Sequence, residues 1–194
     1  TAAARGHGLA NTLAAEMLVR ARAAGASEFR LEVLTRNHVA IKVYERIGMR
    51  PLRRLRVLAW RPDDDTPQPD PAALTSTAPA DLVLNHFNAL HPVAAAWQRE
   101  PASLLSSDGC EGLALVEQDQ LHAYAIVSAD PTQRRILDFA AADNSSADAL
   151  LARLQAISSS LVSVNEPAES PLTNAFARAG FHDADEQHEM VIDL

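Results

Sequence analysis

Arg5-Gly6-His7-Gly8-Leu9-Ala10 is the stretch that decides the fold of this chain of 194 residues. Gly6 and Gly8 have no Cβ, so their backbone can approach an anion closely and adopt positive φ at little cost. A helical apolar period follows over residues 8–24. A helix that begins there directs unpaired N–H groups and the positive end of its dipole at the turn. The pattern predicts a phosphate-binding turn at a helix start.

A second motif follows about thirty residues later, from Asn37 to Met49. Alternating strand formers between the two motifs predict a strand over 29–34, and a second strand is expected over 52–60. A helix is expected on each side of the first strand in the sequence, and each helix carries an apolar stripe that should face the protein core. They consist of Leu9, Leu13, Met17 and Ala21 in the first helix and of Val39, Val43 and Ile47 in the second, which ends at Gly48.

The composition excludes several classes of protein. No apolar run approaches the roughly 18 residues of a membrane helix, and no secretory leader opens the sequence. A single cysteine, Cys110, cannot form an internal disulfide, which is consistent with the reducing cytoplasm that we expect. The seven histidines are scattered and no metal-binding spacing occurs, so no metal is expected.

Charge is unevenly distributed along the chain. Residues 1–61 contain twelve Lys/Arg and four Asp/Glu, whereas residues 62–194 contain five Lys/Arg and twenty-one Asp/Glu. The basic segment is interpreted as a site for an anionic ligand, the alternatives being a nucleic-acid surface or a solvated helix face offset by the acidic part. A nucleic-acid partner is not expected, because no aromatic stacking platform accompanies the arginines.

A Pro/Asp-rich stretch then predicts a linker, since it cannot form a helix or a central strand. A second α/β unit is expected beyond it, with antiparallel hairpins early and strands joined by helices later. Its expected elements are a strand over 75–81, a helix capped by Asp81 that takes in Leu84, Phe87, Leu90 and Trp97, strands over 111–118, 121–128 and 135–141, a helix over 146–157, a strand over 160–164, a helix over 172–179 and a final strand over 189–194.

The first sixty residues resemble the second half of a GNAT-superfamily N-acetyltransferase. The family signature Gln/Arg-x-x-Gly-x-Gly/Ala stands here at residues 5–10, and the pattern Asn-x₂-Ala-x₃-Tyr-x₃-Gly stands at Asn37, Ala40, Tyr44 and Gly48. The resemblance implies an α/β fold with a mixed central sheet flanked by helices. It also implies acetyl-coenzyme A as the acyl donor and cosubstrate, and an amine as the acceptor.

The resemblance assigns roles to particular residues. The turn amides of His7, Gly8 and Ala10 bind the pyrophosphate, Leu9 lies along the same loop, and Arg5 and Gly6 complete the phosphate contact. Asn37 contacts the pantetheine arm and Ala40 lies in the same cofactor site. Tyr44 protonates the departing thiolate.

Each side chain also has a structural alternative. Tyr44 could instead be a core tyrosine with its hydroxyl on a carbonyl, and Asn37 could serve as a helix N-cap, a role compatible with ligand binding. Glu32 lies on the strand next to the expected cofactor slot, which makes it the candidate general base within this chain. Its alternative is a paired or solvated strand carboxylate.

The two parts of the chain align without gaps at an offset of 132 residues. This offset places the second motif of the first part over residues 175–181, where Phe176 replaces Tyr44. The glycine turn is replaced by Ala140-Ala141-Ala142-Asp143-Asn144, whose carboxylate would repel a phosphate. The second part is therefore expected to be a degenerate GNAT-like domain without catalytic residues.

Three domains follow. Residues 1–61 are the C-terminal half of a catalytic GNAT domain, 62–74 are the linker, and 75–194 are a complete degenerate second unit. A GNAT domain has about four strands and one or two helices before the glycine turn, so we expect a preceding segment, or a second chain in a homodimer, to complete the first unit.

The expected activity is acetyl transfer from acetyl-coenzyme A to a primary amine, on a small molecule or a protein N-terminus, by direct attack in a ternary complex. The alternative is a catalytically inactive protein, either a coenzyme A sensor or an interaction scaffold.

Overall fold

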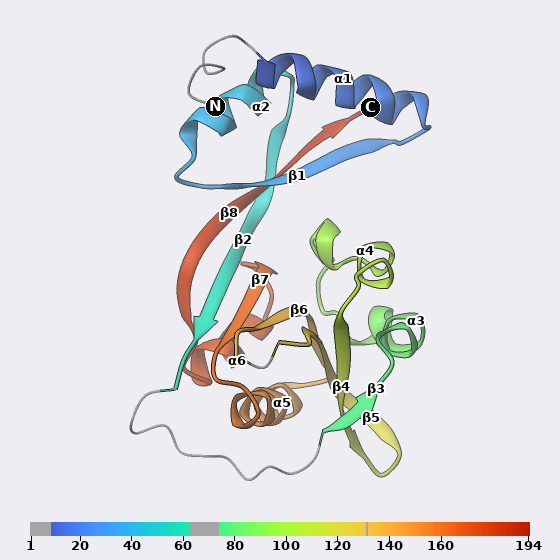
Figure 1. The fold of residues 1–194 in the computed structure, drawn as a ribbon, viewed down its shortest axis with the longest axis vertical. Coiled ribbons are helices and arrows are strands. Elements are labelled where there is room, and N and C mark those ends of the chain that lie inside the picture. Colours follow the sequence, from blue (N-terminus) through green and yellow to red (C-terminus); the bar gives the residue numbers. More distant parts are fainter. Residues whose placement is uncertain (1–8, 63–73, 131) are drawn as a thin grey trace. The chain divides into compact units, whose positions relative to one another are not determined.

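The computed structural model of the chain describes residues 9–62, 74–130 and 132–194 (Figure 1). Helices and strands alternate over residues 9–60 and 144–193, and three strands follow one another over residues 110–141, as the sequence predicts. In chain order they are α1 (Leu9–Ala23), β1 (Glu28–Leu34), α2 (His38–Arg46), β2 (Arg50–Trp60), β3 (Thr75–Thr77), α3 (Pro79–Leu90), a 3-10 turn (Trp97–Arg99), α4 (Pro101–Leu105), β4 (Cys110–Glu117), β5 (Gln120–Ser128), β6 (Arg134–Ala141), α5 (Asn144–Ala156), β7 (Leu161–Pro167), α6 (Leu172–Arg178) and β8 (His182–Asp193).

The eight strands form a mixed sheet in the order β1-β8-β2-β7-β6-β5-β4-β3. β6 and β7 run parallel, and the pairs β1–β8, β2–β7, β3–β4, β4–β5 and β5–β6 are antiparallel. This arrangement is the mixed α/β sheet flanked by helices that the sequence predicts. The parallel pairing covers only Arg134–Ile136 against Leu161–Ser163, so β6 and β7 are not paired further along.

The repeat expected from the sequence is present as a repeat of elements. The order α1-β1-α2-β2 recurs as α5-β7-α6-β8, and corresponding elements begin 132 to 135 residues apart. We call these two sets the first and the second repeat. Their last strands are exchanged: β1 pairs with β8, which belongs to the second repeat, whereas β7 pairs with β2, which belongs to the first.

The exchange explains how the chain divides into compact units. The first compact unit contains Thr1–Arg54 and Glu186–Leu194, and the second contains Leu55–Asp185. β2 and β8 each contribute one end to each unit. These units are defined by contacts, whereas the domains expected from the sequence are defined by homology, so the domain limits at 61 and 75 stay a prediction.

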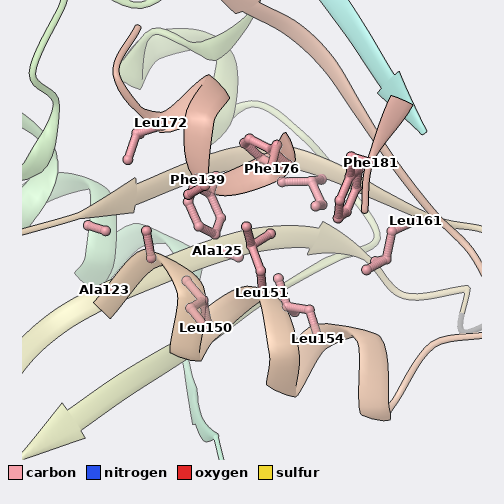
Figure 2. Close-up of a cluster of buried hydrophobic side chains, with 14 of the residues drawn as sticks. Ala123, Ala125, Phe139, Leu150, Leu151, Leu154, Leu161, Leu172, Phe176 and Phe181 are labelled. Atoms are coloured by element: carbon pink, nitrogen blue, oxygen red, sulfur yellow. The ribbon is translucent and has the colours of Figure 1, made fainter. Parts of the chain in front are cut away.

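The second compact unit has the larger core. Leu150, Leu151 and Leu154 of α5 are fully buried against the sheet, together with Phe139 of β6 and Phe176 of α6 (Figure 2). Phe176 contacts Phe139 and Phe181 with ring centroids 5.0 Å apart in both pairs. α3 and α4 pack through Leu82, Phe87 and Leu104 in a separate cluster with Tyr124, Ile126 and Ala140.

The first compact unit has a small core of Val33, Met49 and Met190, on which Tyr44 and Ile192 pack. Here the apolar stripe expected in the first helix is wrong as a buried surface. Leu13 and Met17 are 65% and 52% exposed, and among residues 12–23 of the helix the buried residue is their neighbour Leu18. The apolar residues do recur with the 3.6-residue period of a helix, but no described residue buries the side chains of Leu13 and Met17.

Other differences occur at the ends of elements in the second compact unit. α3 begins at Pro79 with Ala78 as its N-cap, so Asp81 lies in the first turn instead of capping the helix. The strand expected over 75–81 therefore shortens to Thr75–Thr77. Leu84, expected in the core stripe, is exposed, and Trp97 lies in the separate 3-10 turn. β8 begins seven residues earlier than expected, because its polar first half is also part of the strand, which lies between β1 and β2.

Candidate functional site

α1 and α2 border an open groove of about 400 Å³ within the first compact unit. Its lining is largely apolar and comes from both helices. The lining residues are Leu13, Ala14, Met17, Asn37, Val39, Ala40, Val43 and Tyr44. Val39 is 78% exposed, which leaves a large apolar surface facing the groove. A concave apolar groove with a few polar groups at its edge is suited to an organic ligand or to one arm of it.

The groove unites three of the residues singled out in the sequence. Asn37 is the N-cap of α2, and its Oδ1 accepts a hydrogen bond from the Ala40 N–H at 3.2 Å. The N-cap role expected for Asn37 is thus present, and it fixes the start of α2 at the groove. Tyr44 follows two turns later on the same helix, is half-buried and lines the same groove.

The glycine turn cannot be compared with its prediction. Arg5, Gly6, His7 and Gly8 lie outside the described residues, while Leu9 and Ala10 are the first two residues of α1. The first turn of an α-helix presents N–H groups without intrahelical partners. Phosphate binding at residues 5–10 therefore stays a prediction.

Glu32 is not among the residues that line the groove. On β1 its Cα partner is Glu189 of β8. Because side chains alternate along a strand, Glu32 lies on the face opposite Leu31 and Val33, which pack in the core with α2. The structure brings Glu32 together with Glu189, and its role as a base stays a prediction.

The arginines of β2 are paired with the acidic strand β8. Arg53 Nε lies 2.6 Å from Glu189 Oε2, and Arg54 and Arg56 contact Glu186 and Asp183 at 3.1 Å and 2.7 Å. Arg50 lies 3.5 Å from Asp193. The interpretation of the basic segment as an anion site is therefore wrong for these four residues, which contribute to strand pairing.

A buried polar cluster in the second compact unit was not found from the sequence. We call it the Arg99 cluster, and it consists of His91, Arg99, Tyr124, Asp138 and Glu166. Arg99 donates hydrogen bonds to Glu166 and, at 3.3 Å, to Asp138. Tyr124 donates to Asp138 at 2.9 Å. Asp138 and Glu166 lie on β6 and β7 beyond the residues where these strands pair.

Both ring nitrogens of His91 lie against oxygen atoms in this cluster. Its Nδ1 lies 2.9 Å from the Phe87 carbonyl oxygen and its Nε2 lies 3.0 Å from Asp138 Oδ1. Both ring nitrogens face acceptors, and only the imidazolium form can donate from both. Burial alone would lower the pKa of His91, but the hydrogen bond and the charge of Asp138 outweigh it and raise the pKa above its ordinary value.

The same contacts shift the pKa values of Asp138 and Tyr124. Burial would raise the pKa of Asp138, yet the hydrogen bond and charge of His91 and the charge of Arg99 hold it below the usual range. Burial and the adjacent Asp138 charge raise the pKa of Tyr124 far above that of a free phenol. The cavity beside Arg99 measures about 10 Å³, room for about one water molecule. The cluster therefore fills the space between β6 and β7.

The second repeat also lacks the features of the groove. Asp143 caps α5 through a hydrogen bond from the Ser146 N–H to its Oδ1 at 2.8 Å. This carboxylate occupies the helix start that corresponds to the glycine turn. Phe176, at the position of Tyr44, is fully buried. That the second repeat binds no phosphate stays a prediction.

Sequence reasoning missed most of the groove and the Arg99 cluster for different reasons. Leu13, Met17, Val39 and Val43 were assigned to the core, and Val39 is instead largely exposed; an apolar helical period looks the same whether it meets a core or a ligand. For the cluster, a signal was available: Asp138 interrupts an apolar run in its strand, where a buried charge needs a partner.

Among the residues that the structure describes, no group of three or more His, Cys, Asp or Glu side chains could hold a metal ion. Within the same residues, no helix is long and apolar enough to cross a membrane.

Known proteins resemble the chain in both sequence and fold. The model of the acetyltransferase (GNAT) family matches residues 1–49, which include both motifs. No curated protein matches the sequence significantly. The family match covers the sequence of the glycine turn, α1, β1 and α2, and so includes both helices that border the groove.

Several solved structures share the fold. A GCN5-related N-acetyltransferase from Sphaerobacter thermophilus matches with a TM-score of 0.65 and 16% identity, over 97% of this chain and 69% of its own. A GCN5-related N-acetyltransferase from Anabaena variabilis matches with a TM-score of 0.63 and 16% identity, over 96% of this chain and 51% of its own. A tandem GNAT protein from the clavulanic acid biosynthesis pathway matches with a TM-score of 0.62 and 12% identity, over 97% of this chain and 71% of its own.

The chain thus spans between about half and 71% of the length of these proteins. At such low identity the structural matches establish the GNAT acyltransferase fold. Together with the family match at residues 1–49, they support a GNAT acetyltransferase.

Proposed function

We propose that this chain carries the acetyl-coenzyme A-binding part of an N-acetyltransferase that acetylates a primary amine. The observation that carries the proposal is the apolar groove between α1 and α2, which joins Asn37, Ala40 and Tyr44 of the second family motif. The groove begins at the helix that follows the glycine turn, so one ligand could contact the turn with its phosphates and the groove with its apolar arm.

The residues present fit acetyl-coenzyme A. The apolar lining accommodates the pantetheine arm, and the start of α1 with residues 5–10 suits a pyrophosphate. When bound, acetyl-coenzyme A supplies an acetyl group activated as a thioester, which the amine attacks directly in a ternary complex. Tyr44 would donate its hydroxyl proton to the sulfur of the departing thiolate, and the proton that the amine loses would pass through solvent to restore the hydroxyl. The α2 cap at Asn37 fixes the helix that carries Tyr44.

We further propose a tandem arrangement. Residues 1–61 form the second half of the catalytic domain and 75–194 form a degenerate domain, joined by a linker at 62–74. A segment equivalent to 75–141, from upstream or from another chain, would complete the first domain. The 132-residue repeat, the Asp143 cap and Phe176 support this division.

Calorimetry with acetyl-coenzyme A tests the donor site. Leu13→Glu places a charge in the groove, and Val19→Glu is its matched control, because Val19 is exposed on the same helix but does not line the groove. We expect Leu13→Glu to weaken binding at least about tenfold, the effect of about 1.4 kcal/mol. Equal losses in both variants, or no binding by the unmodified chain, would refute the groove as the donor site.

A thiol-release assay over a panel of small amines and peptide N-termini then tests the reaction. Tyr44→Phe removes the proton and keeps the ring, so kcat should fall about 100-fold while acetyl-coenzyme A still binds. Tight binding without turnover on any amine would instead identify a coenzyme A sensor. Unchanged turnover in Tyr44→Phe would overturn the role of its hydroxyl.

A further inference from the structure

The exchanged strand β8 lies beneath the helix that carries Tyr44. β8 pairs with all seven residues of β1, from Glu28 opposite Asp193 to Leu34 opposite Gln187. The repeat assigns β8 to the second repeat, although its C-terminal end lies in the first compact unit. The strand that completes the sheet under α2 therefore comes from the part of the chain that lacks the glycine turn.

Two side chains of β8 determine the packing under Tyr44. Met190 is fully buried with Val33 and Met49, and Tyr44, Ala40 and Ile192 pack against this cluster. Ile192 reaches the turn after α2, where its Cδ1 would lie 3.2 Å from a Cβ on Gly48. Gly48 has a φ of +93°, so this turn combines a glycine conformation with close contact to β8.

The neighbouring part of β2 does not offer an equivalent apolar surface. Its residues in the first compact unit include Arg50, Arg53 and Arg54, which contact carboxylates of β8, and its Leu52 is exposed. Because β2 continues into the second compact unit, Leu58 lies in the core there. The offset of 132 makes Leu58 the counterpart of Met190 in the first repeat.

We propose that Met190 and Ile192 are positioning residues for Tyr44, so that the second repeat supplies a working part of the first repeat's site. The catalytic consequence rests on the proposed function, whereas the placement of Tyr44 does not. In this view the exchange of strands gives the degenerate repeat its role. It holds the ring of Tyr44 at the groove by filling the space beneath α2.

A cofactor-free measurement tests the placement first. The chain has only two tyrosines, Tyr44 and Tyr124, so ring-labelled tyrosine gives two NMR signals in the full-length protein. Met190→Ala should shift the Tyr44 signal and leave that of Tyr124 in place. Met190→Leu, which nearly conserves the volume, should restore it. The matched control Leu58→Ala should leave the Tyr44 signal unchanged.

Kinetics test the consequence for the reaction. A ring displaced by about 1 Å can cost up to about 100-fold in rate, so Met190→Ala should lower kcat at least about tenfold with a smaller change in the KM for acetyl-coenzyme A. Met190→Leu should recover the rate. Circular dichroism verifies that each variant is folded, and Ile192→Val replaces Met190→Ala if the latter does not fold.

The outcomes separate the two proposals. An unchanged Tyr44 signal in Met190→Ala, an equal shift in Leu58→Ala, or no recovery in Met190→Leu would overturn the positioning role. Failure of the unmodified chain to bind acetyl-coenzyme A would overturn the proposed function and leave the NMR test of positioning intact.

Discussion

Arg99→Met should strongly destabilise the second compact unit. The substitution keeps a side chain of similar length and removes the charge that links Asp138 to Glu166. All three side chains are at most 4% exposed, so water cannot replace the lost partner. Asp138 keeps its hydrogen bonds from His91 and Tyr124. Glu166, in contrast, loses the ion pair that its carboxylate forms with Arg99.

The magnitude follows from the charges that remain. With Arg99 and a protonated His91 the cluster is neutral, and without Arg99 it holds one uncompensated buried negative charge. Removing one partner of a buried pair costs about 3–5 kcal/mol. Arg99→Met/Glu166→Met removes both charges and fills their space, so the double variant should be more stable than the single one.

Urea unfolding monitored by tryptophan fluorescence measures this effect, because Trp60 and Trp97 both lie in the second compact unit. With a denaturant dependence of about 2 kcal/mol per molar, the midpoint should fall by about 1.5 M or more. The control Arg178→Met breaks a half-exposed pair with Asp148 and should cost at most about 1 kcal/mol. A loss for Arg99→Met no larger than that of the control would refute the reasoning, as would a double variant less stable than the single one.

Further predictions concern pH and two glycines. The pKa of His91 is raised in the folded state, so its stabilisation is complete below the unfolded value of about 6.5 and is lost as the pH rises through the folded pKa. Urea midpoints between pH 6 and 9 should therefore fall in the unmodified protein and fall less in His91→Gln. Gly112→Ala would bring a Cβ to 2.4 Å from the Thr77 carbonyl oxygen. Thermal unfolding should therefore show that the free energy of unfolding falls by at least about 1 kcal/mol. Gly48→Ala places an alanine at a φ of +93°, and a loss of at least about 1 kcal/mol should appear as faster amide hydrogen exchange in α2; unchanged exchange would contradict it.

Local patterns in the sequence predicted the order of elements well. The apolar period of α2, the alternation in β1 and the glycines after helices are local properties, and Gly25, Gly48 and Gly180 all adopt a positive φ. These features depend on short-range sterics and on which face is apolar. They do not require knowledge of the partner strand.

The exchange of β2 and β8 could not be predicted in this way. Each strand has the same alternation whether it pairs with its own repeat or with the other, because alternation reports which face is buried and not which neighbour is bonded. The burial of Met17 was mispredicted for a related reason. Its helical period indicates an apolar contact, and whether a core or a ligand provides it depends on elements distant in the sequence.

The uneven charge of the chain acquires an explanation from this pairing. β2 is rich in arginine and β8 in carboxylates, and the contacts of Arg50, Arg54 and Arg56 with β8 are largely exposed. Exposed pairs contribute little stability, typically below about 1 kcal/mol each. These pairs instead favour one strand partner and one register, since each strand would meet fewer opposite charges in another register or beside another strand. Arg53 and the buried Glu189 fix the middle of this pairing, and a shift by one residue would turn their side chains to the opposite face of the sheet. These four arginines of β2 therefore act within the fold, where they favour the pairing of β8 with β2, the strand order that also brings β8 to β1.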